Sequence, residues 1–286
     1  MWKEIGCLHL KKLKTLILNQ TTMTIKLKVK PKRANDTSES TKNVGIAKVL
    51  TGKICVQSFF VAPRMSPWNP MDIQRQRAKL GEAELWLMTQ ASRYGKYLEF
   101  SDWSYGLDGS FVDDAVLMTD YQNTQHSNIY PYTLLSRVGF PNLDSYMQWV
   151  KTNTGCSQCI ILIFSNTPGR CFTSQAHNVS SGYNPLECCF LFRFYPWSLT
   201  EIYSTVIAHE ILHLFGAWDL YELNNADHNR ATISAEMFPQ SIMFDGNRDI
   251  WTTQIDEINA WLVGLKEEGK DWYRWFEPGQ SSYESY

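Results

Sequence analysis

The chain has 286 residues and a net charge of −2, with 44% hydrophobic and 20% charged residues. This composition is typical of a globular protein, and the length is sufficient for a sizeable core in one large domain or two modest ones. The near-neutral charge excludes a general nucleic-acid binder, which needs a broad basic surface. No run of apolar residues is long enough for a transmembrane helix.

Charge is distributed unevenly along the chain. Residues 1–33 contain nine Lys and Arg against one acidic residue, Glu4, so the remainder carries about −10. The segment 33–43 is polar and poor in apolar residues, which is typical of a linker. We therefore expect a basic N-terminal arm with its linker over 1–43 and a globular domain over 44–286.

Seven cysteines are present, an odd number, and the N-terminus makes a poor secretory signal because lysines interrupt its apolar run. Together these features favour a reducing compartment and a cytoplasmic location. Cys156 and Cys159, with the later cysteines, leave open a structural zinc site, disulfides or unlinked thiols, and we favour unlinked thiols. The seven are Cys7, Cys55, Cys156, Cys159, Cys171, Cys188 and Cys189.

Four segments have the length and side chains of β-strands, namely 53–63, 97–103, 159–166 and 188–195. The apolar run 159–166, rich in Ile and Phe, predicts a strand buried on both faces.

Helices are expected between and after these strands. Asn69-Pro70 places a capping residue before a proline at the first helical position, and near-helical apolar spacing follows it. Ser198 and Glu201 have the spacing of a capping box before the next long helix. The expected helices are 69–93, 131–138, 143–152, 199–215 and 253–268. Mixed strands and helices predict an α+β or α/β layered domain, and we favour α+β.

The helix expected over 199–215 carries a cluster of potential metal ligands. His209 and His213 are four residues apart, so both imidazoles project from one helix face and can bind a single ion. Glu210 lies roughly 100° around the helix, where a carboxylate can act as general base towards a water that the ion polarises. Neutral imidazole nitrogens suit Zn²⁺.

Two further residues strengthen the prediction. Gly216 lets the chain turn sharply out of the helix, and Asp219 can then return as a third, oxygen ligand. Three protein ligands leave a coordination position open, which is the pattern of a catalytic zinc site.

His209–Asp219, HEILHLFGAWD, resembles the extended metzincin motif in its HExxHxxGxxD form, and Ser241-Ile242-Met243 resembles the Met-turn of that family. The resemblance covers roughly 50–268 and, at motif level, about 209–245.

The resemblance implies that His209, His213 and Asp219 bind zinc, Glu210 serves as base and acid, Gly216 forms the turn and Met243 lies beneath the site. It also implies a twisted mixed β-sheet with a long backing helix and an active-site helix, and a mainly helical or irregular C-terminal subdomain from about residue 217. The strand 188–195 would be the edge strand on which an extended peptide docks.

Four positions near the motif leave alternatives open. Glu236 or His228 could replace Asp219 as the third ligand. Some metzincins have a tyrosine two residues after the methionine, where this chain has Asp245, and Tyr221 is a candidate substitute.

The sequence thus predicts a zinc endopeptidase that acts on a protein or peptide substrate. The alternatives are a catalytically inactive binding or effector module of the same fold, and a zinc amidase acting on a non-protein amide. A monomer is the default expectation, with neither a nucleic-acid partner nor a transmembrane segment.

Overall fold

The computed structural model describes residues 45–175, 177–179, 182–184, 186–221, 228–246 and 248–277. Every described residue belongs to one compact unit, Ser38–Tyr286. The predicted arm and linker over 1–43 lie outside the described residues. Among those described, no helix is both long and apolar enough to cross a membrane.

A five-stranded sheet with the order β2-β1-β3-β7-β4 forms the centre of the domain. β1 pairs in parallel with β2 and β3, and β3 pairs in parallel with β7, whereas the short edge strand β4 runs antiparallel to β7. The sheet is therefore mixed but mostly parallel, and the fold is α+β, as predicted. The strands are β1 (Gly52–Val61), β2 (Leu98–Tyr105), β3 (Gln158–Pro168), β4 (Phe172–Ser174), β7 (Cys188–Phe194), and a separate hairpin of β5 (His177–Val179) and β6 (Gly182–Asn184).

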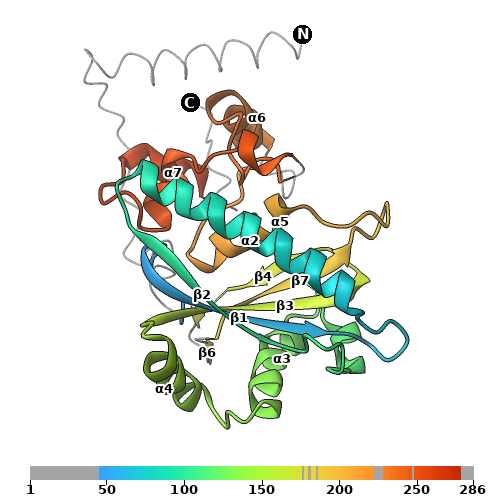
Figure 1. Cartoon of the computed structure of the whole chain (residues 1–286). Helices are drawn as coiled ribbons and strands as arrows, with labels where there is room; N and C mark the ends of the chain where they lie inside the picture. Colours follow the sequence, from blue (N-terminus) through green and yellow to red (C-terminus); the bar gives the residue numbers. More distant parts are fainter. Residues whose placement is uncertain are drawn as a thin grey trace, which may run out of the picture. The chain divides into compact units, whose positions relative to one another are not determined.

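Helices cover both faces of this sheet (Figure 1). The helices are α2 (Pro70–Arg93), α3 (Thr124–Arg137), α4 (Leu143–Thr154), α5 (Ser204–Leu214), α6 (His228–Met237) and α7 (Glu257–Leu262). Short 3₁₀ segments are η2 (Asp114–Met118), η4 (Ile250–Thr252) and η5 (Asp271–Phe276).

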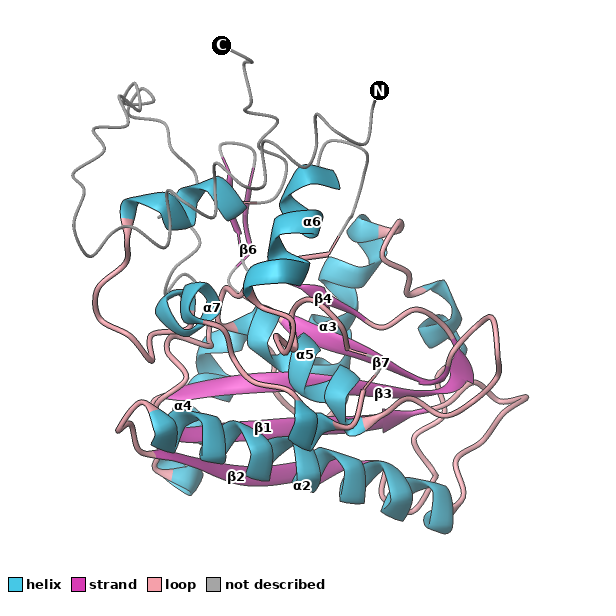
Figure 2. Cartoon of the chain, turned by 90° about the horizontal axis from the view of Figure 1, so that it is seen from above, coloured by secondary structure: helices cyan, strands magenta, loops and turns pink. Residues whose placement is uncertain are grey.

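Successive side chains of each strand point to opposite faces of the sheet, and they form two hydrophobic cores, one on each face. In β1, Ile54 and Phe60 join the core beneath α2 and α5, while Cys55 and Phe59 join the core beneath α3 and α4. Neighbouring strand residues point to opposite faces, so a strand that is apolar at nearly every position must be covered on both sides. Viewed from above, α2 and α5 lie over the same face of the sheet (Figure 2).

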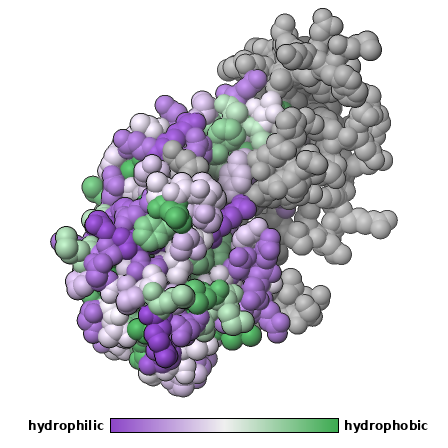
Figure 3. All heavy atoms as spheres, turned by 90° about the vertical axis from the view of Figure 1, so that its right-hand side faces the viewer, coloured by the Kyte–Doolittle hydropathy of each residue, from purple (hydrophilic) through white to green (hydrophobic). Residues whose placement is uncertain are grey.

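On the face of Figure 3, apolar side chains are distributed among polar ones instead of forming one continuous patch. Large hydrophobic side chains that are exposed include Met65, Trp197 and Leu199. Scattered exposure of this kind is normal for a protein surface.

The long helix and the central strands confirm their sequence predictions. α2 begins at Pro70, and the Asn69 side chain accepts a hydrogen bond from the backbone N–H of Asp72 at 2.9 Å. The predicted segment 131–138 proves to be the second half of α3, which starts at Thr124 and accommodates Pro131 inside the helix.

Three expectations were wrong in detail. α5 starts at Ser204 rather than 199, because Ser198 and Glu201 do not form the capping box; Glu201 bonds Arg193 and Lys79 instead. The strand at 188–195 is internal, because β4 covers its outer side and forms the sheet edge. The C-terminal helix is much shorter than 253–268 and is capped by Asp256.

The described cysteines, Cys55, Cys156, Cys159, Cys171, Cys188 and Cys189, are free thiols, as favoured from the sequence, and Cys7 lies outside the described residues. Most are packed as small apolar side chains in the two cores.

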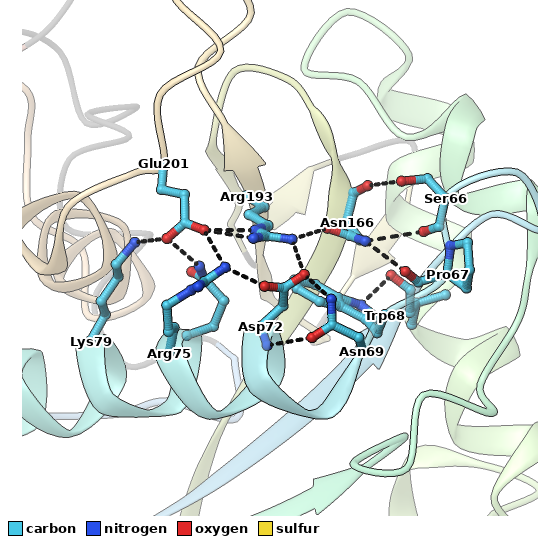
Figure 4. Close-up of polar contacts among 12 residues, drawn as sticks. Ser66, Pro67, Trp68, Asn69, Asp72, Arg75, Lys79, Asn166, Arg193 and Glu201 are labelled. Atoms are coloured by element: carbon cyan, nitrogen blue, oxygen red, sulfur yellow. Dashed lines mark hydrogen bonds and ion pairs between the residues drawn. The ribbon is translucent and has the colours of Figure 1, made fainter.

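A buried charge network joins α2, the sheet and the segment before α5 (Figure 4). The Arg193 guanidinium, at the end of β7, lies 2.5 Å from the Asp72 carboxylate and 2.7 Å from the Glu201 carboxylate. It also donates to the Asn166 side-chain oxygen at 3.0 Å. Arg193 is only 8% exposed, so these contacts replace nearly all of its hydration.

Removing Arg193 should take the buried cation away from the Asp72 and Glu201 carboxylates, which would then keep only the more exposed Arg75 and Lys79 as partners. We expect Arg193→Gln to lower the free energy of unfolding by about 3–5 kcal/mol, measured by urea denaturation. Arg75→Gln is the matched control, because Arg75 contacts the same carboxylates from a side chain that is 53% exposed, and its loss should cost less than about 1 kcal/mol. Equal losses in the two variants would contradict the role assigned to Arg193.

Candidate metal site

Helix α5 places the predicted ligands at the edge of the larger core. Ile207, Ala208 and Ile211 are fully buried in that core and fix the rotation of the helix about its axis. His209 and Glu210 are buried, and the side chain of His213 is 12% exposed.

The chain leaves α5 through Gly216, whose φ of 93° lies in the left-handed region. A Cβ at Gly216 would meet no atom within 4 Å, so backbone conformation rather than space favours glycine here. The N–H of Ala217 bonds back to the carbonyl of Leu212 at 3.1 Å, which directs the following segment towards the helix again. Asp219 is thereby brought beside the two histidines.

Three atoms capable of binding a metal converge at this point. The Nε2 atoms of His209 and His213 lie 3.1 Å apart, and the Asp219 Oδ1 atom is 3.1 Å from the first and 3.2 Å from the second. This Oδ1 atom is buried, and no other described group donates a hydrogen bond to it. Among the described residues, His209, His213 and Asp219 form the group that could hold a metal ion.

Backbone carbonyls orient both imidazoles. The Nδ1 atom of His209 lies 3.0 Å from the carbonyl oxygen of Ile242, and that of His213 lies 2.8 Å from the carbonyl oxygen of Ala217. A carbonyl can only accept, so each Nδ1 carries the proton and each Nε2 offers its lone pair to the common centre. This arrangement fixes the tautomer that a metal site requires.

The charged groups of this cluster shift one another's pKa values. Burial lowers the pKa of the His213 imidazole, but the Asp219 carboxylate outweighs this effect and raises the pKa to about 9. Burial opposes ionisation of Asp219, yet the two imidazoles hold the pKa of its carboxyl well below its usual range. Without a metal, the three atoms therefore share a proton.

Glu210 points to the edge strand of the sheet. The hydroxyl of Thr173, on β4, lies 2.8 Å from the Oε2 atom of Glu210 and 2.9 Å from its backbone carbonyl oxygen. The hydroxyl has a single hydrogen, which it can donate to either acceptor. Thr173 therefore lies against both the backbone carbonyl and the carboxylate of Glu210. The sequence did not reveal this contact, because a threonine in a three-residue strand carries no periodic signal.

The turn at 241–245 contacts both the site helix and the loop that carries Asp219. Met243 is fully buried, and its carbonyl oxygen accepts a hydrogen bond from the N–H of Leu220, next to Asp219, at 2.9 Å. Ser241 donates to the Asp256 carboxylate at 2.6 Å, which ties the turn to the cap of α7.

Asn259, in α7, completes this support. Its side-chain oxygen accepts from the N–H of Trp218 at 2.7 Å, and its amide donates to Asp256 at 2.9 Å. Asp256 and Asn259 thus connect the ligand loop to the 241–245 turn, and nothing in their spacing distinguished them from an ordinary helix start.

The alternative ligands lie apart from this group. Glu236 is exposed on α6 and is not among the converging residues. The side chain of His228 lies outside the described part of the chain. Asp245 forms an ion pair with Arg248 at 2.7 Å. Tyr221 does approach the centre: its ring stacks on that of His209, with centroids 6.2 Å apart.

No protein-family model and no curated protein matches the chain. A solved structure, metalloproteinase-II from Bacteroides fragilis, is 11% identical, with 82% of this chain aligned and a TM-score of 0.34. The match covers 61% of that protein's length. A likeness this distant assigns neither a family nor an activity to the chain.

The raised pKa of His213 has a consequence for metal binding. The stability contributed by its protonated form is fully present below its ordinary pKa of 6.5 and is lost as pH rises to about 9. A metal must displace this proton, so binding at about pH 7 should release it in addition to any proton lost by metal-bound water, whereas well above pH 9 only the water should contribute. Calorimetry of metal binding in buffers of different ionisation enthalpy measures this number. Equal proton release at both pH values would contradict the ion pair between His213 and Asp219.

Proposed function

We propose that the chain is a zinc-dependent endopeptidase with a metzincin-like catalytic domain. The observation that carries the proposal is the convergence of three ligand atoms within 3.2 Å of one another, with both histidines held in the metal-binding tautomer. Burial of these atoms supports it, because three buried ligand atoms that face one another need a shared proton or a metal ion between them.

The donor set fits zinc. Zn–N and Zn–O bonds of about 2.0–2.1 Å in tetrahedral geometry separate neighbouring ligand atoms by about 3.3 Å. The separations of 3.1–3.2 Å come close to this value. His209, His213 and Asp219 would hold the ion. When bound, zinc supplies Lewis acidity towards a carbonyl and towards water.

Glu210 is the proposed general base. Its backbone follows His209 directly, and Thr173 holds one of its carboxylate oxygens, so the other is free to accept a proton from the attacking water. The same carboxyl can then return the proton to the leaving amine. When Thr173 donates its hydrogen to Oε2 rather than to the backbone carbonyl, it holds the side chain of Glu210 in one orientation.

Tyr221 is the proposed partner of the oxyanion. Burial, with the charges of Asp219 and Glu210, raises the pKa of its hydroxyl and keeps it protonated. Arg170 donates to the tyrosine oxygen, which leaves the tyrosine proton to be donated elsewhere. A hydroxyl beside the histidines can therefore stabilise negative charge that develops on a carbonyl oxygen.

A peptide is the proposed substrate because the outer edge of β4 has no strand partner among the described residues. No described strand pairs with the outer edge of β4, and Thr173 on this strand contacts the base. An extended peptide that added itself to this edge would bring its backbone past Glu210.

Replacing the base tests the function directly. We expect Glu210→Gln to retain zinc and to lower peptide hydrolysis by about 10²- to 10⁴-fold, since a general base contributes a factor of that size. The measurements are zinc content by elemental analysis and digestion of a peptide library. Glu236→Gln is the matched control, since it removes an exposed carboxylate and should change neither reading.

Any other outcome would contradict a specific part of the proposal, namely the mechanism, the ligand set or the substrate. Unchanged hydrolysis in Glu210→Gln would refute the proposed mechanism, and loss of zinc in Glu236→Gln would refute the ligand set. Zinc binding without cleavage of any peptide would leave a non-protein amide as the substrate or assign a binding role.

Thr173 provides a second test. Thr173→Val keeps the branched shape but removes the hydroxyl, so turnover should fall about 10- to 100-fold, the value of a hydrogen bond to a charged group. KM and zinc content should change little. Thr173→Ser should restore most of the turnover, and failure of this rescue would indicate that the valine disturbs packing instead.

A further inference from the structure

A cavity of about 470 Å³ opens at the carboxyl ends of β1 and β3. Pro63, just beyond β1, and Thr167 and Pro168, at the end of β3, contribute to its wall. In sheets with parallel strands this end is the usual place for ligands. Phe192 of β7 supplies an apolar surface, and Asp120 and Arg170 supply the two charged groups.

Arg170 connects this cavity to the metal site. Besides lining the cavity, it hydrogen-bonds the hydroxyl of Tyr221, whose ring stacks on His209. Its guanidinium also lies over the ring of Tyr121, 5.0 Å from the centroid. The two tyrosines thus restrict an exposed arginine that would otherwise be free to move.

Arg170 lacks a carboxylate partner among the residues that the structure describes. Within the described part of the chain, no carboxylate forms an ion pair with it, and its polar partners are tyrosine hydroxyls. Asp120, the acid in the wall, instead accepts a hydrogen bond from the backbone N–H of Gln122 at 2.7 Å. A planar guanidinium with unused donors matches a carboxylate, which it can bind through two parallel hydrogen bonds.

The cavity also lies at a useful distance from the base. Arg170 precedes Thr173, the residue that contacts Glu210, by three positions in the sequence. Residues 169–171 connect β3 to β4 and are not in a strand, and three residues of chain span at most about 10–11 Å. A peptide alongside β4 would therefore place one of its side chains, within about three residues of the cleaved bond, near the cavity.

We propose that this cavity is a substrate subsite for an acidic side chain, Asp or Glu, with Arg170 as the residue that determines the specificity. The carboxylate binds the guanidinium, and the apolar stem of the side chain packs on Phe192. This inference rests on the proposed peptidase function and adds to it the class of substrate.

The test is digestion of a peptide library by the zinc-loaded full-length protein, followed by kcat/KM for a preferred peptide and its Glu-to-Gln counterpart. The wild type should enrich Asp and Glu at one fixed position within about three residues of the cleaved bond. Arg170→Gln should abolish this enrichment and lower the preference for the Glu peptide by about tenfold or more. Arg64→Gln is the matched control: this exposed arginine adjoins the cavity wall, but Asp114 already neutralises it at 3.7 Å. The preference should survive in that variant.

The results distinguish a failure of the proposed subsite from a failure of the proposed peptidase function. If the wild type cleaves peptides without an acidic preference, or the preference persists in Arg170→Gln, the subsite is refuted and the peptidase stands. Equal loss for the Glu and Gln peptides in Arg170→Gln would also refute it and would assign Arg170 to positioning Tyr221. If the wild type holds zinc but cleaves no peptide, the proposed function and the subsite fall together.

Discussion

Burial of the Arg193 guanidinium is the constraint on which the rest of the domain depends. A charged group with so little exposure must be satisfied by the protein, and Arg193 collects its partners from α2, from β3 and from the segment ahead of α5. These three elements are distant in sequence. Their common dependence on one cation fixes α2 over the sheet and determines where the chain enters the site helix. The position of His209 and His213 follows from that entry point.

The sequence was most informative where local signals and packing agree. Asn69 and Pro70 mark the start of α2, and the apolar run of β3 requires a strand that is covered on both faces. The site was predictable for the same reason, because the positions of His209 and His213 follow from helix geometry alone. Asp219 required only the turn at Gly216 in addition.

The predictions from sequence failed where a residue far away in the sequence determines the local structure. Ser198 and Glu201 have the spacing of a helix cap, yet Glu201 is bound by Arg193 and Lys79, so the helix begins later. β4 was missed because three residues are too few for alternation to be detected. Consequently the contact of Thr173 with Glu210 was missed too, since it depends on a strand pairing that only the folded chain reveals.

The brevity of β4 limits how this edge can recognise another chain. Successive residues of a strand direct their backbone groups to opposite sides, so three residues offer an incoming strand on the order of two pairing positions. So short an edge is a poor template for aggregation, which protects a sheet whose other strands are long and apolar. It is equally a weak anchor, because so few backbone hydrogen bonds cannot distinguish one extended segment from another. Selectivity at this edge must then come from side chains at its two ends.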